Sequence, residues 1–158
     1  LDAETQRLYP RDNLRQPLRI LLDSQNRITP QHRVVQQPGA TWLARLQADE
    51  QIWPQDVEQF ICPAHGGGVD LVVMMMLLAK RQVNSIWVEA GASLAGALLQ
   101  AGLVDELILY IAPKLLGDNG RGLCHLPGLE RLADAPEFVF SDVRQVGPDL
   151  RLRLRAKH

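Results

Sequence analysis

The chain has 158 residues, a formal net charge of −1 and 46% hydrophobic residues, values typical of one globular domain. This near-neutral charge argues against binding to nucleic acid or an anionic membrane, and no apolar run approaches the about 18 residues that span a bilayer. Its two cysteines, Cys62 and Cys124, are too few for a disulfide framework, so we expect reduced thiols and a cytoplasmic protein.

The first part of the chain predicts a series of short strands. Residues 1–7 are polar and lack an initial Met, which we interpret as a loop entered partway along a longer polypeptide. The apolar run 18–23 predicts a strand buried on both faces. Residues rich in β formers at 33–36 and 41–45 flank a turn and predict two more strands, and residues 59–62 predict another.

Residues 66–81 predict a joint followed by a helix. Three glycines at 66–68 indicate a flexible connection, and Asp70 is a good N-cap for a helix over residues 71–81. The methionines at 74–76 suggest metal ligands, but thioethers without Cys or His nearby favour core packing instead.

The second half predicts a strand, a helix and three further strands. Residues 85–89 have strand composition, and the small residues of 92–101 predict a helix that Gly102 closes. Further strands are expected at residues 107–112, 138–146 and 150–154, the last two joined as a hairpin. Strands alternating with helices, then a hairpin, indicate an α/β fold with a largely parallel sheet and an antiparallel end.

Several kinds of catalytic site are disfavoured by residue spacing. Cys62 and His65, or the neighbours Cys124 and His125, lack zinc-finger spacing, and the zinc-deaminase signature does not occur. The glycines around Ser93 are not spaced as in a nucleophile elbow, and there is no G-K-[ST] phosphate loop. We therefore expect no metal site and no nucleophilic triad.

The strongest candidate site is the turn between the strand at 85–89 and the helix at 92–101. The first amides of a helix lack internal partners, and the helix dipole attracts phosphate. Gly91 allows a tight turn and a close approach to a ligand, and the Ser93 hydroxyl can cap an amide or contact a phosphate oxygen. The pattern alone is explained equally well by tight packing, with Gly96 against the sheet.

Two polar residues lie at strand ends, where open α/β sheets bind ligands. Glu89 ends the strand at 85–89, and Ser24 follows the strand at 18–23. A solvated strand end for Glu89 and an ordinary Asp-Ser turn for Ser24 are the alternatives.

Four segments together resemble the reductase domain of the bacterial bifunctional riboflavin biosynthesis deaminase/reductase. They are residues 22–24, 85–91, 94–99 and 105–117, and the resemblance extends from about Leu8 to the C-terminus. It implies a dihydrofolate-reductase-like fold: a mixed, mostly parallel sheet flanked by helices, with a C-terminal antiparallel hairpin. It also implies that residues 1–158 form one domain, the later portion of the reductase domain. The deaminase domain and the start of the reductase domain are then absent, so we expect this piece alone to be inactive.

The resemblance implies NADPH-dependent reduction of 5-amino-6-(5-phosphoribosylamino)uracil to the ribitylamino compound. Glu89 matches the carboxylate that contacts the substrate and is the candidate catalytic residue. Ser24 matches a cofactor contact. The remaining residues match the cofactor-binding turn, in which Gly91-Ala92 replaces the more common Gly-Pro or Gly-Gly: Gly91, Ala92, Ser93, Leu94, Ala95, Gly96 and Ala97.

The partner expected from this resemblance is a small pyrimidine ribosyl phosphate, with neither nucleic acid nor membrane, in a homodimer or homotetramer. Two other functions remain open from the residues: a dihydrofolate-reductase-like enzyme with another substrate, and a catalytically silent nucleotide-binding module.

Overall fold

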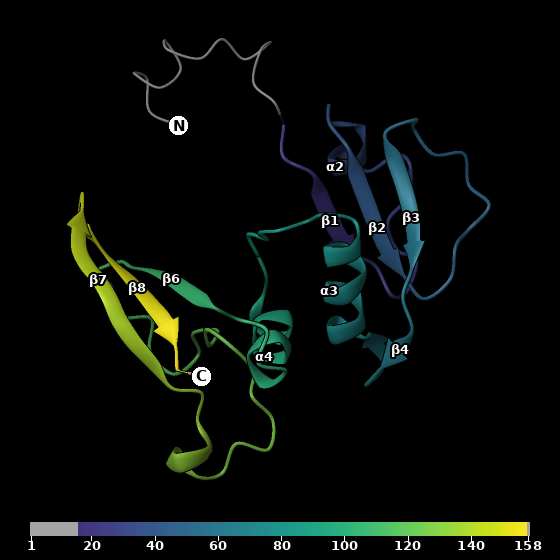
Figure 1. Cartoon of the computed structure of the whole chain (residues 1–158). Coiled ribbons are helices and arrows are strands. Elements are labelled where there is room, and N and C mark those ends of the chain that lie inside the picture. The colour runs from purple at the N-terminus through teal and green to yellow at the C-terminus, as the bar shows by residue number, and fades with distance from the viewer. Residues whose placement is uncertain (1–15, 158) are drawn as a thin grey trace. The chain divides into compact units, whose positions relative to one another are not determined.

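The protein is represented by a computed structural model that describes residues 16–157. The polar stretch 1–7 and Leu8 lie outside the described residues. The chain divides into two compact units, Leu1–Gln82 and Val83–His158, and each is described by itself (Figure 1). Along the described chain, no helix is both long and apolar enough to cross a membrane.

The first unit contains the parallel sheet that the sequence predicts. Its strands are β1 (Arg19–Leu22), β2 (Thr41–Arg45) and β3 (Val57–Ile61), in the order β1-β2-β3. Both pairings are parallel, with Arg19 opposite Thr41 and Thr41 opposite Val57. The central strand β2 is the most buried of the three, because it has a hydrogen-bonded neighbour on each side.

The prediction of a strand at residues 33–36 is wrong. These residues form the short helix α2 (Arg33–Gln36), in which the amides of Val35 and Gln36 bond to the carbonyl of His32. No strand among the described residues pairs with this segment, so its β-forming side chains have no ladder to join. Val35 instead turns into the core.

The glycines at 66–68 form a hairpin turn, where the sequence indicated a flexible joint. Strand β4 (Ala64–His65) pairs antiparallel with β5 (Gly68–Val69). Gly66 and Gly67 both have positive φ, at 58° and 80°, the conformation that a two-residue type I′ turn requires and that glycine adopts at little cost.

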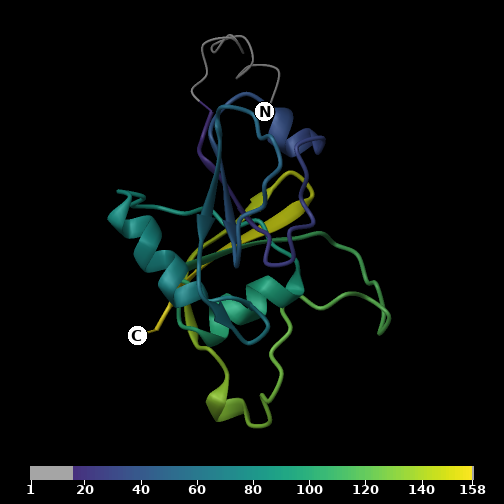
Figure 2. The ribbon, with the colours of Figure 1, turned by 90° about the vertical axis from the view of Figure 1, so that its right-hand side faces the viewer.

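Helix α3 (Leu71–Lys80) begins as predicted at Asp70, whose carboxylate accepts a hydrogen bond from the Val73 amide at 3.0 Å. Figures 1 and 2 show α3 beside the parallel sheet. At its C-terminal end, the Arg81 guanidinium lies 4.9 Å from the centre of the Trp42 ring. Met74 and Leu78 are buried on this helix, which confirms core packing for Met74, whereas Met76 is 59% exposed and lies outside the core.

The second unit lacks the strand expected at residues 85–89. This segment has no regular structure, and Trp87 is 71% exposed. Strand-forming side chains are not sufficient, because a strand also needs a neighbour for its backbone groups, and no described strand pairs here. Helix α4 (Ala92–Gln100) follows. Gly102 ends it as predicted, with φ of 65° and the Leu103 amide bonded to the Leu98 carbonyl.

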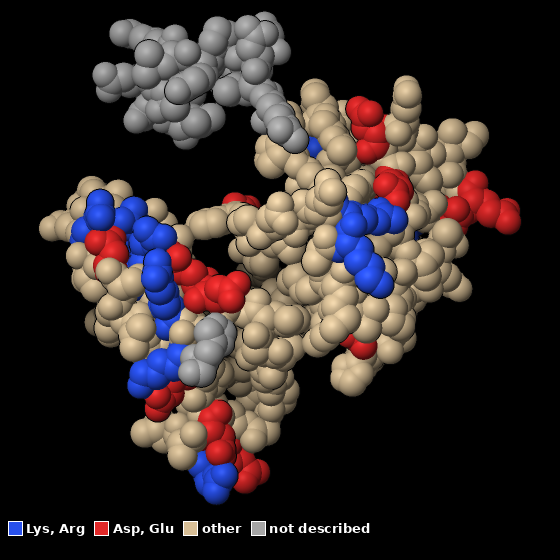
Figure 3. Space-filling view, viewed as in Figure 1, with Lys and Arg blue, Asp and Glu red and all other residues tan. Residues whose placement is uncertain are grey.

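An antiparallel sheet completes the second unit. Strands β6 (Glu106–Ile111), β7 (Phe138–Val146) and β8 (Asp149–Ala156) have the order β6-β8-β7, and a short 3-10 helix, η2 (Leu132–Asp134), precedes β7. Basic side chains gather over the β7–β8 hairpin beside acidic ones (Figure 3). The predicted α/β class and terminal hairpin are confirmed, but the described strands form separate parallel and antiparallel sheets.

Candidate functional site

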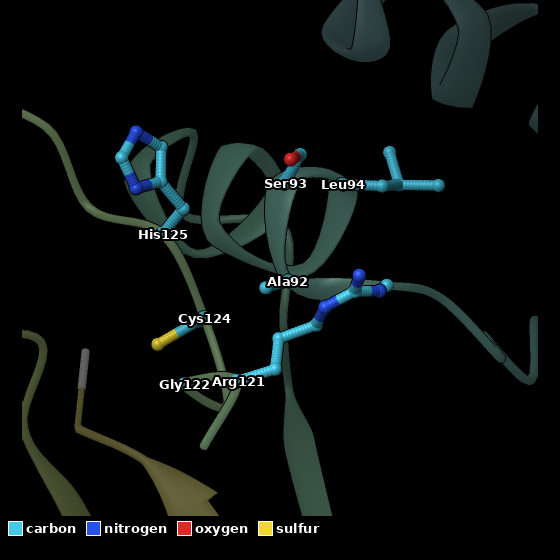
Figure 4. Close-up of a pocket in the computed structure, with 8 residues that line it drawn as sticks. Ala92, Ser93, Leu94, Arg121, Gly122, Cys124 and His125 are labelled. Carbon is cyan, nitrogen blue, oxygen red and sulfur yellow. The ribbon is translucent and has the colours of Figure 1, made fainter. Parts of the chain in front are cut away.

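An open pocket of about 760 Å³ lies at the N-terminal end of α4, within the second unit (Figure 4). One wall is the start of the helix, and the other is a loop that lies about thirty residues later in the chain. The lining residues are Gly91, Ala92, Ser93, Leu94, Arg121, Gly122, Cys124 and His125. The structure therefore places the first four residues of the predicted cofactor turn at a cavity.

The start of α4 leaves its first amides available. Its N-cap is Gly91, and the first intrahelical bond runs from the Ala95 amide to the Gly91 carbonyl, 3.1 Å away. Among the described residues, no side chain caps this end, in contrast to α3 with Asp70. Of the two roles that the sequence allows the Ser93 hydroxyl, capping of an amide is not observed among these residues. Uncapped amides and the positive end of the helix dipole together favour a bound anion.

Gly91 contributes space at this site, and its conformational freedom is not used. Its φ of −77° and ψ of 170° are extended backbone that any residue adopts. The prediction that a glycine is needed here for a tight turn is therefore wrong. A Cβ at Gly91 would meet no atom within 4 Å. A Cβ there would therefore extend into open space without a clash, at a residue that lines the pocket.

The second wall of the pocket is attached to α4 by backbone contacts. The His125 amide donates to the Ala92 carbonyl at 2.9 Å, and Gln100 Nε2 donates to the Pro127 carbonyl at 2.9 Å. A Cβ on Gly96 would overlap the carbonyl group of His125. Gly96 thus permits close packing as expected, but against this loop and not against the sheet.

The second wall of the pocket was not predicted from the sequence, and its charged residue is Arg121. It is exposed, and it has no hydrogen-bond or ion-pair partner within residues 16–157. Its side chain extends from the loop toward the start of α4 (Figure 4). A guanidinium beside free helix amides strengthens an anion site. Nothing in the local sequence signals this, because Arg121 reaches the pocket only when the loop folds back on the helix.

The other predicted cofactor residues are placed away from the pocket wall. Ala95 and Ala97 are half-buried on α4, and Gly96 is buried against His125. Glu89 is exposed, two residues before Gly91, and it does not line the pocket. Their roles stay predictions.

Ser24 belongs to the first unit and is described there. It lies half-buried in the turn directly after β1, as the sequence predicts. The turn folds over the buried carboxylate of Asp23, which accepts hydrogen bonds from the amides of Arg27 at 2.8 Å and Ile28 at 3.1 Å.

The cysteines and histidines do not assemble into a metal centre in the described part of the chain, where no group of three or more potential ligands is found. Burial raises the pKa of the Cys62 thiol, and the nearby Asp70 carboxylate raises it further. The raised pKa disfavours the thiolate of Cys62, which is the form that binds metals and reacts.

Comparison with known proteins identifies the family. The RibD C-terminal domain family matches residues 2–152. The chain is 67% identical over 154 residues to the riboflavin biosynthesis protein RibD of Escherichia coli strain K12, covering 98% of this chain and 42% of that protein. It is 36% identical over 157 residues to a Buchnera aphidicola protein named 5-amino-6-(5-phosphoribosylamino)uracil reductase, covering 99% of this chain and 76% of that protein.

A solved structure agrees with the sequence relatives. Acinetobacter baumannii RibD, form 1, is 28% identical with a TM-score of 0.74, covering 100% of this chain and 40% of that one. The chain thus spans about 40% of the length of the RibD proteins that it matches. The match supports the predicted dihydrofolate-reductase-like α/β fold. On this evidence, the chain belongs to the RibD C-terminal domain family.

Proposed function

We propose that the chain belongs to the reductase part of an enzyme that uses NADPH to reduce 5-amino-6-(5-phosphoribosylamino)uracil to the ribitylamino compound. The observation that carries this proposal is the uncapped start of α4, which opens on a pocket lined by Arg121, a residue without an ion-pair partner in the described part of the chain. The name of the 36% identical Buchnera reductase supports the choice of reaction.

The first turn of α4 would hold a phosphate group of the cofactor. The amides of Ala92, Ser93 and Leu94 would donate to its oxygens, and the Arg121 guanidinium would offset its charge. Bound NADPH supplies the hydride, so the chain's own task is to align and bind the reactants. Ser24 is proposed as a further cofactor contact, on the basis of the family resemblance.

Glu89 is proposed as the catalytic and substrate-contacting carboxylate. It has no ion-pair partner among the residues described, and its exposed position leaves both oxygens available to a ligand. A carboxylate there accepts hydrogen bonds from substrate hydroxyl or amino groups and orients them.

The test is a comparison of ligands and substrates on the full-length protein. NADPH, NADH and ATP are titrated while protein fluorescence or heat is followed, and NADPH oxidation is then measured with the pyrimidine substrate and with dihydrofolate. We expect preferential NADPH binding and turnover of the pyrimidine alone. Equal, weak binding of the three nucleotides would favour a silent binding module, and turnover of dihydrofolate alone would favour another reductase.

We also propose a cytoplasmic homodimer or homotetramer, as the family resemblance implies. Light scattering coupled to size-exclusion chromatography measures the mass of the assembly directly, and a monomeric mass at micromolar concentration would contradict this proposal.

A further inference from the structure

The turn that carries Ser24 is held by an arginine on the neighbouring strand. Leu22 of β1 pairs with Ala44 of β2, so the next residues, Asp23 and Arg45, meet at the carboxyl ends of the two strands. Arg45 donates to Oδ2 of Asp23 from Nε at 3.0 Å and from Nη2 at 2.7 Å. Both residues are buried, with 0% of Arg45 and 4% of Asp23 exposed.

The same guanidinium reaches both ends of the turn. Nη2 of Arg45 also donates to the carbonyl of Ile28 at 2.7 Å, while the Asp23 carboxylate accepts the Ile28 amide. Within the turn, the amide of Asn26 bonds to the Asp23 carbonyl at 3.2 Å. Arg45 therefore closes the loop from residue 23 to residue 28, with Ser24 inside it.

The other terminal nitrogen of the guanidinium, Nη1, also has a hydrogen-bond acceptor for each of its hydrogens. Nη1 donates to Asp49 at 2.6 Å and to Gln59 at 2.8 Å, so every N–H group of Arg45 has an acceptor. The Trp53 ring lies against the cation, 4.9 Å from Cζ to its centre, and its indole N–H donates to Asp49 at 2.8 Å. In this Arg45 cluster (Asp23, Arg45, Asp49, Trp53 and Gln59), the guanidinium is held by hydrogen bonds in its plane and by the Trp53 ring against it.

Stability alone is a poor reason for such an arrangement. Removing two charges from water costs several kcal/mol per ion, and apolar replacements of buried ion pairs are often neutral or stabilising. A fully satisfied polar network instead selects one conformation of the backbone that it touches. Here that backbone is the turn after a parallel strand, the edge of the sheet where α/β proteins bind ligands.

We propose that Arg45 is a positioning residue for cofactor binding: it holds the turn at residues 23–28 in the one conformation that presents Ser24 to NADPH. The inference rests on the proposed function, because it explains how Ser24, the cofactor contact proposed there, is held in position by Arg45. Arg45 itself is buried, with every N–H group bonded to a protein acceptor, so it would act on the cofactor only through the turn.

The test uses Arg45→Lys in the full-length protein. Lysine keeps the charge but cannot hold Asp23, Ile28 and Asp49 at once, because it lacks the planar fork. We expect the KM and dissociation constant for NADPH to rise by about tenfold, while kcat and the KM for the pyrimidine change by less than about twofold. Hydrogen exchange at the Arg27 and Ile28 amides should become faster.

Arg81→Met is the matched control. Arg81 is another arginine of the first unit, with an ion pair to Glu58 and contacts to the Trp42 and Phe60 rings, but it does not contact the turn. We expect it to lower the melting temperature without changing the KM for NADPH. A matching rise in KM in this variant would show a general effect of instability and overturn the inference.

A double variant separates positioning from stability. If Arg45 acts through Ser24, Arg45→Lys combined with Ser24→Ala should bind NADPH no more weakly than Ser24→Ala alone. Additive losses, or an unchanged NADPH KM in a folded Arg45→Lys protein, would overturn the inference and leave the proposed function intact. Failure of the unaltered protein to bind NADPH would overturn both.

Discussion

The backbone amide of His125 donates a hydrogen bond to the carbonyl oxygen of Ala92 at 2.9 Å, which attaches a distant loop to the first turn of α4. This contact places the second wall of the pocket beside the start of the helix. Without it, the pocket would lose its second wall. The free amides of α4 would then face open solvent, and Arg121 would not lie beside them.

Gly96→Ala should displace the loop from α4. The new Cβ would overlap the His125 carbonyl, so either the helix or the loop must move, at a cost of about 1–3 kcal/mol in the free energy of unfolding. Denaturant unfolding measures this cost, and NADPH titration should show weaker binding. Gly122→Ala is the control, because its Cβ would meet only the Cys124 carbonyl at 3.9 Å. Equal stability of the two variants would contradict the prediction.

Gly91→Val should abolish NADPH binding and preserve the fold. The valine side chain enters open space at the pocket wall, where it would obstruct the approach of a phosphate to the helix amides. Circular dichroism checks the fold, and fluorescence titration measures the dissociation constant. Undiminished binding would remove this turn from the cofactor site.

Arg121→Gln should weaken NADPH binding by about tenfold, because a charge-assisted hydrogen bond to phosphate is lost. The salt dependence of the dissociation constant should become less steep as well. Arg155→Gln, an exposed arginine on β8 outside the pocket, serves as the control and should behave like the unaltered protein. Identical salt dependence in both variants would speak against a phosphate at Arg121.

Glu89→Gln should lower kcat and kcat/KM for the pyrimidine substrate and leave the NADPH dissociation constant within about twofold. The amide keeps the shape but loses the charge and one acceptor, so only interactions of the carboxylate with the substrate are affected. Steady-state kinetics and a separate NADPH titration distinguish the two effects. Normal turnover would exclude Glu89 from catalysis.

Asp49 should make the stability of the first unit depend on pH. Burial alone raises the pKa of Asp49, but hydrogen bonds from Trp53, Arg45 and Gln51 outweigh it and lower the pKa from 3.8 to about 2. The carboxylate therefore stabilises the fold above its unfolded pKa, and this contribution is lost as the pH falls from about 5 to about 2.

Unfolding followed by circular dichroism across this pH range checks the effect. Asp49→Asn should be less stable at pH 7, and its stability should fall less steeply on acidification. Asp56→Asn, which removes an exposed carboxylate of the same unit outside the cluster, is the control. A steeper loss in Asp49→Asn than in the unaltered protein would contradict the assignment.

The sequence by itself determined the features that depend on neighbouring residues. The Asp70 cap of α3 and the Gly102 end of α4 are decided within one helical turn, so local residue types predict them. The terminal hairpin follows from alternation around a short turn, and Phe138–Val146 has its predicted bounds. The order of the matching segments was sufficient to identify the family, although the assignment of one domain stays a prediction.

Only the tertiary structure decided the features that depend on distant residues. Residues 33–36 and 85–89 have strand composition, but a strand exists only where another strand supplies backbone partners. Arg121 and Arg45 gave no local signal, because each acquires its role from residues that folding brings to it. The predicted phosphate turn was recognisable from Gly91 onward, whereas the loop that makes it a pocket was not, since the His125–Ala92 contact joins positions far apart in the chain.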